Sequence, residues 1–326
     1  MWILRSLPAT VAVVAFAYAV VLAVGGGSER CGGVTIEPVE PDPTAPYRNG
    51  RAAFSVEVDG VSIPYRLMTV SVLPRQEVEL EVLGADRPSV CADRGDLEPI
   101  DESRWRWRAP RRPGIESVTI ATRRSSIELR MLVLTPYDGR KRVKGFRVGA
   151  YEREPLRGDP VYERPRGLFR VDRDDVDLAL SPHFRLAPFL SRQTDDFPQY
   201  VLVDTRLLLK LELLLERVNG AGIDASTFGI LSGYRTPHHH EKSGNTTTYS
   251  RHLYGYAADI VIDRNGDGIM DDIDGDGRVT RRDVERLAAI LEASDLPEYL
   301  PGGLSVSTRA RGPFLHVDAR GTQVRW

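Results

Sequence analysis

The sequence is poor in several residue types, and each shortage limits what the protein can be. Only two of its 326 residues are cysteine, Cys31 and Cys91, and only six are histidine. Two cysteines can form one disulfide in an oxidising compartment or remain as two free thiols. The formal net charge is −2, so the composition gives no reason to expect a nucleic-acid partner. A Gly-x-Ser-x-Gly nucleophile elbow is also missing, which argues against a serine hydrolase.

The remaining composition is that of an ordinary globular protein, with 41% hydrophobic and 28% charged residues and a length sufficient for two domains. Residues 6–28 carry no charge and are mostly apolar, with Arg5 before them and Glu29 after them. Such a stretch can just span a bilayer, and its positive flank orients the rest outward. We expect residues 1–30 to be an uncleaved signal anchor, with a cleaved signal peptide as the alternative. Both place the remainder in the cell envelope, on the periplasmic side, anchored to the inner membrane or secreted.

The next part of the chain predicts strands. Residues 31–50 include a proline-rich stretch and predict a linker. Residues 53–58 and 61–63 flank Asp59-Gly60, which is a strong hairpin signal. Further strands are expected at residues 78–82, 105–108, 118–121 and 127–131. This pattern predicts a small Ig-like β-sandwich over residues 51–137, serving as a spacer or an adhesion unit.

The second half mixes helix and strand signals. Residues 138–179 are rich in Arg, Asp, Pro and Gly and predict an irregular connector. A leucine-rich run at residues 205–219 predicts a largely buried helix. Residues 228–231 predict a strand that carries Arg235 at its end. We therefore expect an α+β core over residues 180–326.

One motif organises this core, Ser-x-His-x-x-Gly-x-Ala-x-Asp at residues 250–259. His252 falls in a loop, and Asp259 stands at the start of an apolar strand. Near the C-terminus, an alternating segment places His316 and Asp318 on one face. A catalytic zinc site needs three protein ligands and an open position for water. The spacing therefore predicts that His252, Asp259 and His316 bind one metal ion.

These residues belong to three ordered motifs that resemble the M15 family of zinc D-Ala-D-Ala peptidases, close to its peptidoglycan endopeptidase branch. The motifs are Ser-Gly-Tyr-Arg-Thr-Pro at residues 232–237, the motif at 250–259, and a terminal His-x-Asp-x-Arg-Gly at 316–321. The resemblance covers roughly residues 180–326 and implies a zinc-peptidase core.

The resemblance also implies roles for individual residues. It makes His252, Asp259 and His316 the zinc ligands, and Arg235 the group that polarises the scissile carbonyl. The alternatives for Arg235 are binding of a substrate carboxylate and a plain structural ion pair. The resemblance suggests Ser250 and Tyr234 as substrate-binding residues.

Two features depart from that family. Its members often carry glutamate three residues before the last zinc histidine, but this position is Pro313, which cannot accept a proton. Asp318 is then the candidate general base, with orientation of a ligand histidine as its alternative role. The run His238–His240 replaces the usual tyrosine and asparagine, and is either an accessory metal site or a solvated loop. His183 is expected to cap a local turn.

Residues 263–283 form an acidic, glycine-punctuated insert. Its second half resembles a dockerin-type half EF-hand, with carboxylates and glycine at the positions of a calcium loop. Its first half also matches a calcium loop, but both loops would need Asp274, so they are not two independent EF-hands. We expect one or two structural calcium ions, with a merely acidic turn as the alternative, followed by an amphipathic helix. The candidate ligands are Asp263, Asn265, Asp267, Asp272, Asp274, Asp276 and Asp283.

The sequence thus predicts an exported zinc metallopeptidase, a carboxypeptidase or endopeptidase, that hydrolyses peptidoglycan stem peptides containing D-amino acids. The alternative is a non-catalytic cell-wall recognition module that holds zinc and calcium, because Hedgehog signalling domains share this zinc arrangement and act through binding. A third possibility, a calcium-dependent scaffold module, requires a duplicated loop–helix unit that the sequence lacks. The expected partners are the stem peptides and, through the N-terminal segment, the membrane.

Overall fold

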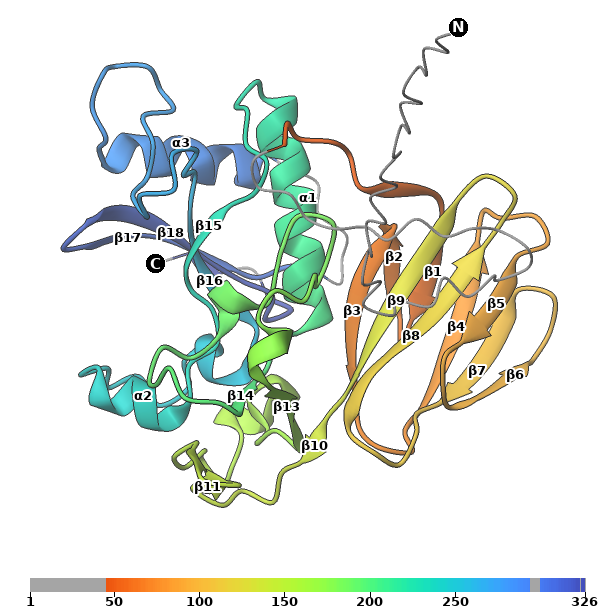
Figure 1. Ribbon diagram of the computed structural model, residues 1–326. Helices are drawn as coiled ribbons and strands as arrows, with labels where there is room; N and C mark the ends of the chain where they lie inside the picture. Colours follow the sequence, from red (N-terminus) through yellow and green to blue (C-terminus); the bar gives the residue numbers. More distant parts are fainter. Residues whose placement is uncertain (1–44, 294–299, 323, 326) are drawn as a thin grey trace, which may run out of the picture.

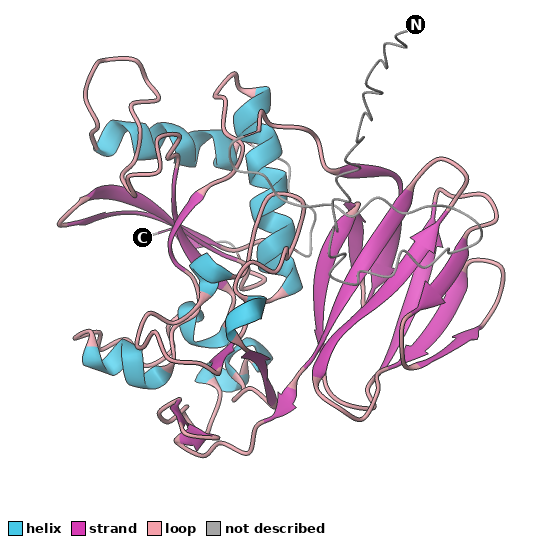
Figure 2. Ribbon diagram, viewed as in Figure 1, coloured by secondary structure: helices cyan, strands magenta, loops and turns pink. Residues whose placement is uncertain are grey.

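A computed structural model describes residues 45–293, 300–322, 324 and 325. Within these ranges the protein is mostly β, with three α-helices (Figure 2). The expected anchor or signal segment, residues 1–30, and most of the expected linker lie outside the described residues. Among the helices that are described, none is long and apolar enough to cross a membrane. Cys91 is in a disulfide, and the only other cysteine of the sequence, Cys31, lies outside the described residues.

Residues 51–133 form two β-sheets that face each other (Figure 1). The first sheet contains, in spatial order, β2 (Val61–Tyr65), β1 (Arg51–Val58), β4 (Glu77–Leu83), β7 (Arg104–Arg108) and β6 (Asp96–Pro99). The second contains β3 (Leu67–Val72), β9 (Ser126–Val133), β8 (Gly114–Ala121) and β5 (Ser89–Ala92). The β-rich prediction for this part is confirmed.

Alternation of side chains explains how this part buries its core. In β4, Val78, Leu80 and Val82 are buried, and the glutamates between them are more exposed. At the β1–β2 hairpin, Asp59 and Gly60 both have positive φ angles, 49° and 77°. Two consecutive residues with positive φ characterise the tight turn that matches strand twist, and Asp-Gly is a preferred pair for it.

The C-terminal part is built around a five-stranded sheet (Figure 1). Its spatial order is β15 (Gly229–Ser232), β16 (Ala257–Val261), β18 (Gly312–Asp318), β17 (Gly303–Arg309) and β19 (Val324–Arg325). Helix α3 (Arg281–Glu292) packs against β17 and β18. It buries the face predicted from the sequence, Val284, Leu287, Ala288 and Leu291.

Helix α1 (Thr205–Gly220) lies between this sheet and the two N-terminal sheets (Figure 1). The side chain of Asp204 caps its first turn by accepting a hydrogen bond from the Arg206 amide. The Thr205 hydroxyl donates to the Thr69 carbonyl of β3 at 2.9 Å, and Lys210 Nζ donates to the Asp318 carbonyl of β18 at 2.7 Å. Because both sides of the helix are covered, every residue from Leu207 to Leu215 is buried, and one apolar core runs through both parts.

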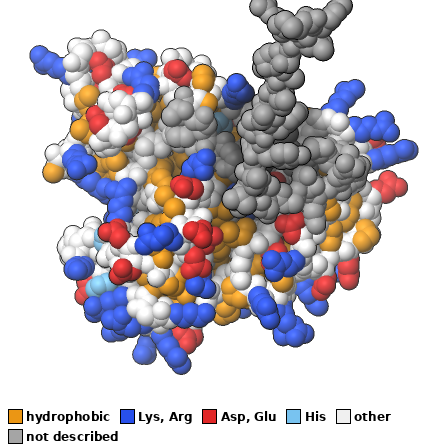
Figure 3. Space-filling view, in the orientation of Figure 1, with side chains coloured by type: hydrophobic (Ala, Val, Ile, Leu, Met, Phe, Trp, Pro, Cys, Tyr) orange, Lys and Arg blue, Asp and Glu red, His pale blue; other side chains and the backbone are white. Residues whose placement is uncertain are grey.

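The segment predicted to be an irregular connector, residues 138–179, contains regular structure, so that prediction is wrong in part. A short hairpin, β11 (Arg142–Val143) and β12 (Phe146–Arg147), lies near its start. Lys and Arg side chains gather at the lower left of Figure 3, where Figure 1 places β11. β13 (Gly167–Val171) pairs with β10 (Thr135–Pro136) and β14 (Gln199–Val201). Single 3₁₀ turns lie in it at Leu156–Gly158, Pro160–Tyr162 and Arg173–Asp175, and a fourth follows it at Ala187–Phe189. The segment therefore folds with the C-terminal part.

Candidate metal centre

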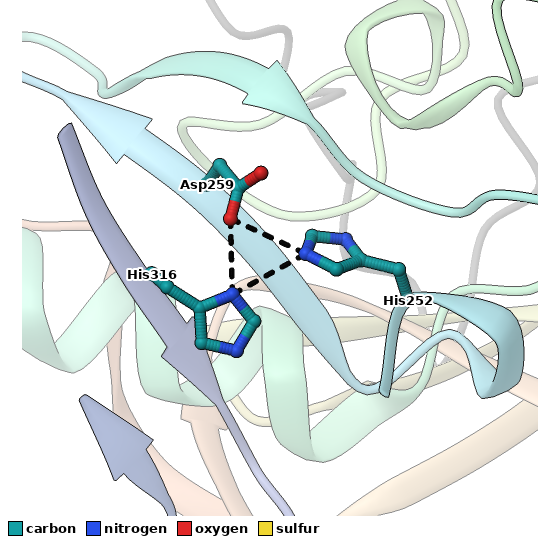
Figure 4. A group of neighbouring side chains, drawn as sticks. All are labelled: His252, Asp259 and His316. Atoms are coloured by element: carbon teal, nitrogen blue, oxygen red, sulfur yellow. Dashed lines mark hydrogen bonds and ion pairs between the residues drawn. The ribbon is translucent and has the colours of Figure 1, made fainter. Parts of the chain in front are cut away.

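Three side chains that are far apart in sequence meet on the C-terminal sheet (Figure 4). His252 lies in a 3₁₀ turn, η5 (Arg251–Tyr254), which ends at Gly255 with a positive φ of 76°. Asp259 is on β16, and His316 is its direct partner on the antiparallel strand β18. Directly paired residues point to the same face of a sheet, so the strand register itself brings Asp259 and His316 together.

The donor atoms of these residues form a nearly equilateral triangle. His252 Nε2 lies 3.2 Å from Asp259 Oδ1 and 3.3 Å from His316 Nδ1. The third side, from His316 Nδ1 to Asp259 Oδ1, is 2.9 Å. A tetrahedral zinc ion with bonds of about 2.0–2.1 Å holds its ligand atoms roughly 3.3 Å apart. The triangle is therefore close to the size that a tetrahedral metal ion requires, and its three donor atoms could hold one.

Each histidine is held at its other ring nitrogen. His252 Nδ1 lies 2.7 Å from the Gly233 carbonyl, to which it donates, so that Nε2 faces the triangle. His316 Nε2 lies 3.4 Å from Asp318 Oδ2, so that Nδ1 faces the triangle. Such outer hydrogen bonds fix the tautomer and the ring orientation of metal ligands. The site is thus pre-oriented by the fold.

The electrostatics of the triangle are strongly perturbed. Burial lowers the pKa of His252, which favours the neutral ring that a metal requires. Burial alone would raise the pKa of Asp259, but His252 and His316 hold it well below its ordinary value. Burial alone would lower the pKa of His316, yet its hydrogen bonds to Asp259 and Asp318 raise it.

Two arginines converge on the second oxygen of Asp259. Arg235 donates to Oδ2 at 2.8 Å, and its Nη2 is also 3.5 Å from His252 Nε2. Arg309, at the end of β17, contacts the same oxygen and lies over the Phe314 ring, 4.5 Å from its centre. Arg309 was not among the predicted site residues. It has no motif signal, because only the β17–β18 pairing brings it to the centre.

Asp318 lies behind His316 and not beside the triangle. Its carboxylate is fully buried and is bound by the Arg320 guanidinium and by the Gly303 amide, 2.9 Å from Oδ1. Burial alone would raise its pKa, but Arg320 and His316 keep it well below the ordinary value. This position favours the orienting role over the general-base role, because the oxygens already accept from several donors.

Tyr234 and Ser250, the two residues predicted to bind substrate, differ in their burial. Tyr234 is 2% exposed, and its hydroxyl is 2.8 Å from the Tyr151 hydroxyl. The hydroxyl of Tyr234 is thus buried and already hydrogen-bonded, and its role in binding substrate stays a prediction. Ser250 is half-buried directly before η5.

The remaining histidines also lie apart from the triangle. His238, His239 and His240 belong to a short helix, α2 (Pro237–Lys242), and not to a solvated loop. His183 donates from its backbone to Glu212 Oε1 at 2.9 Å, and its ring Nδ1 is 2.6 Å from Oε2. Its expected role as a local turn cap is therefore replaced by a pair with α1.

The acidic insert brings together a second group of carboxylates, from Asp272, Asp274 and Asp276. Asp283 does not belong to that group. Its Oδ1 accepts from the Ile273 amide at 2.9 Å and its Oδ2 from the Thr280 amide at 2.7 Å. Asp283 thus completes a capping box with Thr280, the N-cap of α3, and its buried carboxylate has a backbone donor on each oxygen.

The first half of the insert repeats the hydrogen bonds of the second. Asp263 accepts from the amides of Gly266 and Gly268, at 2.8 and 2.9 Å. Asp272 accepts from those of Gly275 and Gly277, both at 2.7 Å. In each half two further side chains accept a hydrogen bond from the amide two residues later. They are Asn265 and Asp267 in the first half, and Asp274 and Asp276 in the second.

The chemistry that this part of the molecule offers is therefore a buried His–Asp–His triangle with two guanidinium groups beside it. Comparison with protein-family models, with curated proteins and with solved structures finds no match for the chain.

Proposed function

We propose that the protein is an exported zinc metallopeptidase, a carboxypeptidase or endopeptidase, that hydrolyses peptidoglycan stem peptides containing D-amino acids. The observation that carries the proposal is the triangle of His252, Asp259 and His316 with Arg235 at its edge. Its support beyond geometry is the resemblance of the three ordered motifs to M15 peptidases.

Zinc fits the donor set better than calcium or magnesium do, since two imidazoles and one carboxylate suit it and the hard cations prefer oxygen. When bound, zinc lowers the pKa of its water and polarises a carbonyl. His252, Asp259 and His316 hold it, with Asp318 and the Gly233 carbonyl orienting the two rings.

Arg235 and Arg309 stabilise negative charge at the open side of the site. Arg235 is only 14% exposed, so solvent screens its charge less than that of Arg309, which is 40% exposed. A guanidinium in this place donates hydrogen bonds to an oxygen that becomes negative as the peptide carbonyl is attacked. Arg235 is therefore the principal oxyanion donor, and Arg309 assists it.

One observation favours a second function, that of a zinc- and calcium-bound cell-wall recognition module. Pro313 occupies the position of the family's usual catalytic glutamate, and Asp318 is engaged behind His316. A site whose carboxylates are already engaged can bind a peptide but lacks the general base that speeds its hydrolysis.

The two functions separate in one experiment. Zinc-loaded protein is incubated with purified muropeptides, and both binding and release of new amino groups are followed. A peptidase releases amine in proportion to bound zinc, and a His252→Ala variant releases none. Stoichiometric binding of the same muropeptides without any amine release would replace the peptidase by the recognition module.

A further inference from the structure

The hairpin at the edge of the C-terminal part is unusually basic. Residues 140–147 contain five Lys or Arg and no acidic residue. These five side chains, Arg140, Lys141, Arg142, Lys144 and Arg147, are all exposed. Figure 3 shows Lys and Arg side chains gathered at the lower left, where Figure 1 places β11 and α2. We call the exposed side chains of Lys141, Arg142, Lys144 and Arg147 the basic ridge.

The strand register exposes the charges and anchors the hairpin. Val143 pairs with Phe146, whose ring is buried 5.7 Å from that of Tyr200. Arg142 pairs directly with Arg147, so two like charges face each other across the strands. Like charges in directly opposite positions destabilise a β-ladder. The fold therefore carries an unfavourable pair here.

In the part of the chain that the structure describes, no side chain of the ridge forms an ion pair with a carboxylate. Across the described ranges, the only ion pair of the hairpin region joins Arg140 to Asp138 at 3.0 Å. Exposed arginines on β7 differ from the ridge in this respect. Arg104, Arg106 and Arg108 each lie within 3.0 Å of a carboxylate. The lack of ion pairs at the ridge is thus local and not a general property of the described surface, and Arg142 donates only to the neutral Gly145 carbonyl, at 2.9 Å.

The hairpin is also fixed in place against α2. The Val148 and Gly149 amides donate to the Lys141 carbonyl at 3.0 and 3.1 Å, and the His238 amide donates to the Val148 carbonyl at 2.9 Å. Gly149 has a φ of 91°, and a Cβ there would lie 2.4 Å from the backbone nitrogen of His238. Glycine therefore allows a close contact that holds the ridge rigidly beside α2.

Two hollows flank the ridge and share Arg147 and His238. The larger, about 480 Å³, is lined by polar side chains that include Asn245, Thr246, Thr247 and Thr248, together with Glu152 and Glu241. The smaller, about 300 Å³, contains Gln193, Thr194 and Asp196. Hydroxyl, amide and carboxylate groups form hydrogen bonds with neutral hydroxyl groups of a ligand.

This combination selects one class of partner. Single-stranded nucleic acid needs aromatic side chains for base stacking, but the larger hollow has no Phe, Tyr or Trp. The smaller hollow has two, of which Phe146 is buried against Tyr200 and Phe197 lies against Arg173. A membrane surface needs exposed apolar side chains, and the large ones in the described part are Leu83, Ile100 and Val279, all outside the hairpin and α2. We propose that the basic ridge and its two hollows bind an anionic polysaccharide, with the charged groups on the ridge and sugar hydroxyls in the hollows.

The proposal is tested with the full chain and polygalacturonate, a linear polymer of uronic acid, as the probe. The test variant replaces the ridge by glutamine: Lys141→Gln, Arg142→Gln, Lys144→Gln and Arg147→Gln. The matched control replaces four exposed arginines elsewhere: Arg111→Gln, Arg112→Gln, Arg123→Gln and Arg124→Gln. Both variants lose the same charge. A single Arg147→Gln variant, which removes the like-charge pair, tests the proposal if the fourfold ridge variant does not fold.

We expect the wild type and the control to bind polygalacturonate with an affinity that falls as salt is raised. The ridge variant should bind at least ~10-fold more weakly, since each exposed ion pair contributes a factor of roughly 1.5 to 5. The Arg147→Gln variant should show a smaller loss in the same direction, with no fall in melting temperature. Neutral dextran, duplex DNA and phosphatidylglycerol vesicles should bind more weakly than polygalacturonate.

Three results would overturn the proposal. The first is no binding of polygalacturonate by the wild type. The second is an equal loss in the ridge variant and in the control, which would mean general charge attraction. The third is binding of DNA or vesicles at least as tight as that of polygalacturonate, which would assign the ridge to that other class of partner.

Discussion

Asp318 and His316 form a pair in which the carboxylate lies behind the imidazole ring, with Oδ2 3.4 Å from Nε2. The opposite ring nitrogen, Nδ1, is 2.9 Å from Asp259 Oδ1, on the side of the metal centre. The ring therefore separates Asp318 from the metal position. This relationship determines how the residue must be tested.

The Asp318→Asn substitution should weaken zinc binding. Loss of an outer-shell carboxylate typically lowers metal affinity by about 10- to 100-fold. The measurement is competition for zinc with a chelator, and Asp138→Asn, at an exposed position, serves as the control. Unchanged zinc affinity together with lost turnover would return Asp318 to the role of general base.

Arg235 and Arg309 should differ in their effect on catalysis. Arg235→Ala should lower turnover about 100- to 1000-fold while the protein keeps its zinc, as expected for the loss of one oxyanion donor. Arg309→Ala should cost less, because that side chain is more exposed. Turnover and zinc content are measured for both variants and for an Arg311→Ala control. Arg311 lies with Arg309 in the β17–β18 hairpin, and its variant should behave as the wild type. Equal effects of Arg311 and Arg235 substitutions would refute a specific role for Arg235.

Calcium should stabilise the acidic insert through Asp272, Asp274 and Asp276. A ligand that binds only the folded state adds about 2.7 kcal/mol at 100 times its dissociation constant. Melting temperature should therefore rise with calcium in the zinc-loaded protein, and an Asp272→Asn/Asp274→Asn variant should lose that rise.

Asp283 should show a different pattern from these ligands. Because it completes the capping box of α3, Asp283→Asn should lower stability by about 1 kcal/mol both with and without calcium. A calcium response that disappears in Asp283→Asn would show instead that this carboxylate binds the ion.

The pair of His183 and Glu212 should make stability depend on pH. Burial alone would lower the pKa of His183, but its bond to Glu212 outweighs burial and raises it. The protonated ring therefore stabilises the folded state fully below the unfolded pKa of about 6.5. That stability is lost as pH rises through the higher folded pKa. Melting temperature in His183→Gln should lack this decline, and His238→Gln should retain it.

Local patterns in the sequence account for much of the fold. The α3 face and the Asp59-Gly60 turn followed from spacing alone. β3 was missed because Leu67–Val70 is buried on both faces and shows no alternation, since α1 covers its outer side. β13 was missed because its short strand depends on pairing with β14, which lies far along the chain.

The candidate site shows the same division. Motif spacing predicted that His252, Asp259 and His316 lie together, and the structure groups them. The pairing of β16 with β18 places Asp259 directly opposite His316. The place of Arg309 at the site could not be predicted from the sequence, since it depends on the register of β17 against β18. The side of the His316 ring on which Asp318 lies is a matter of side-chain orientation, which alternation along a strand does not determine.

The most direct test of the central claim is a zinc titration of metal-free protein in the presence of muropeptides, with cleavage followed by mass spectrometry. The account predicts that hydrolysis of bonds next to D-amino acids rises with zinc and reaches its plateau at about one zinc per chain. A His252→Ala/His316→Ala variant should show no hydrolysis at any zinc concentration. Stoichiometric zinc binding by the wild type with no cleavage of any muropeptide would contradict it.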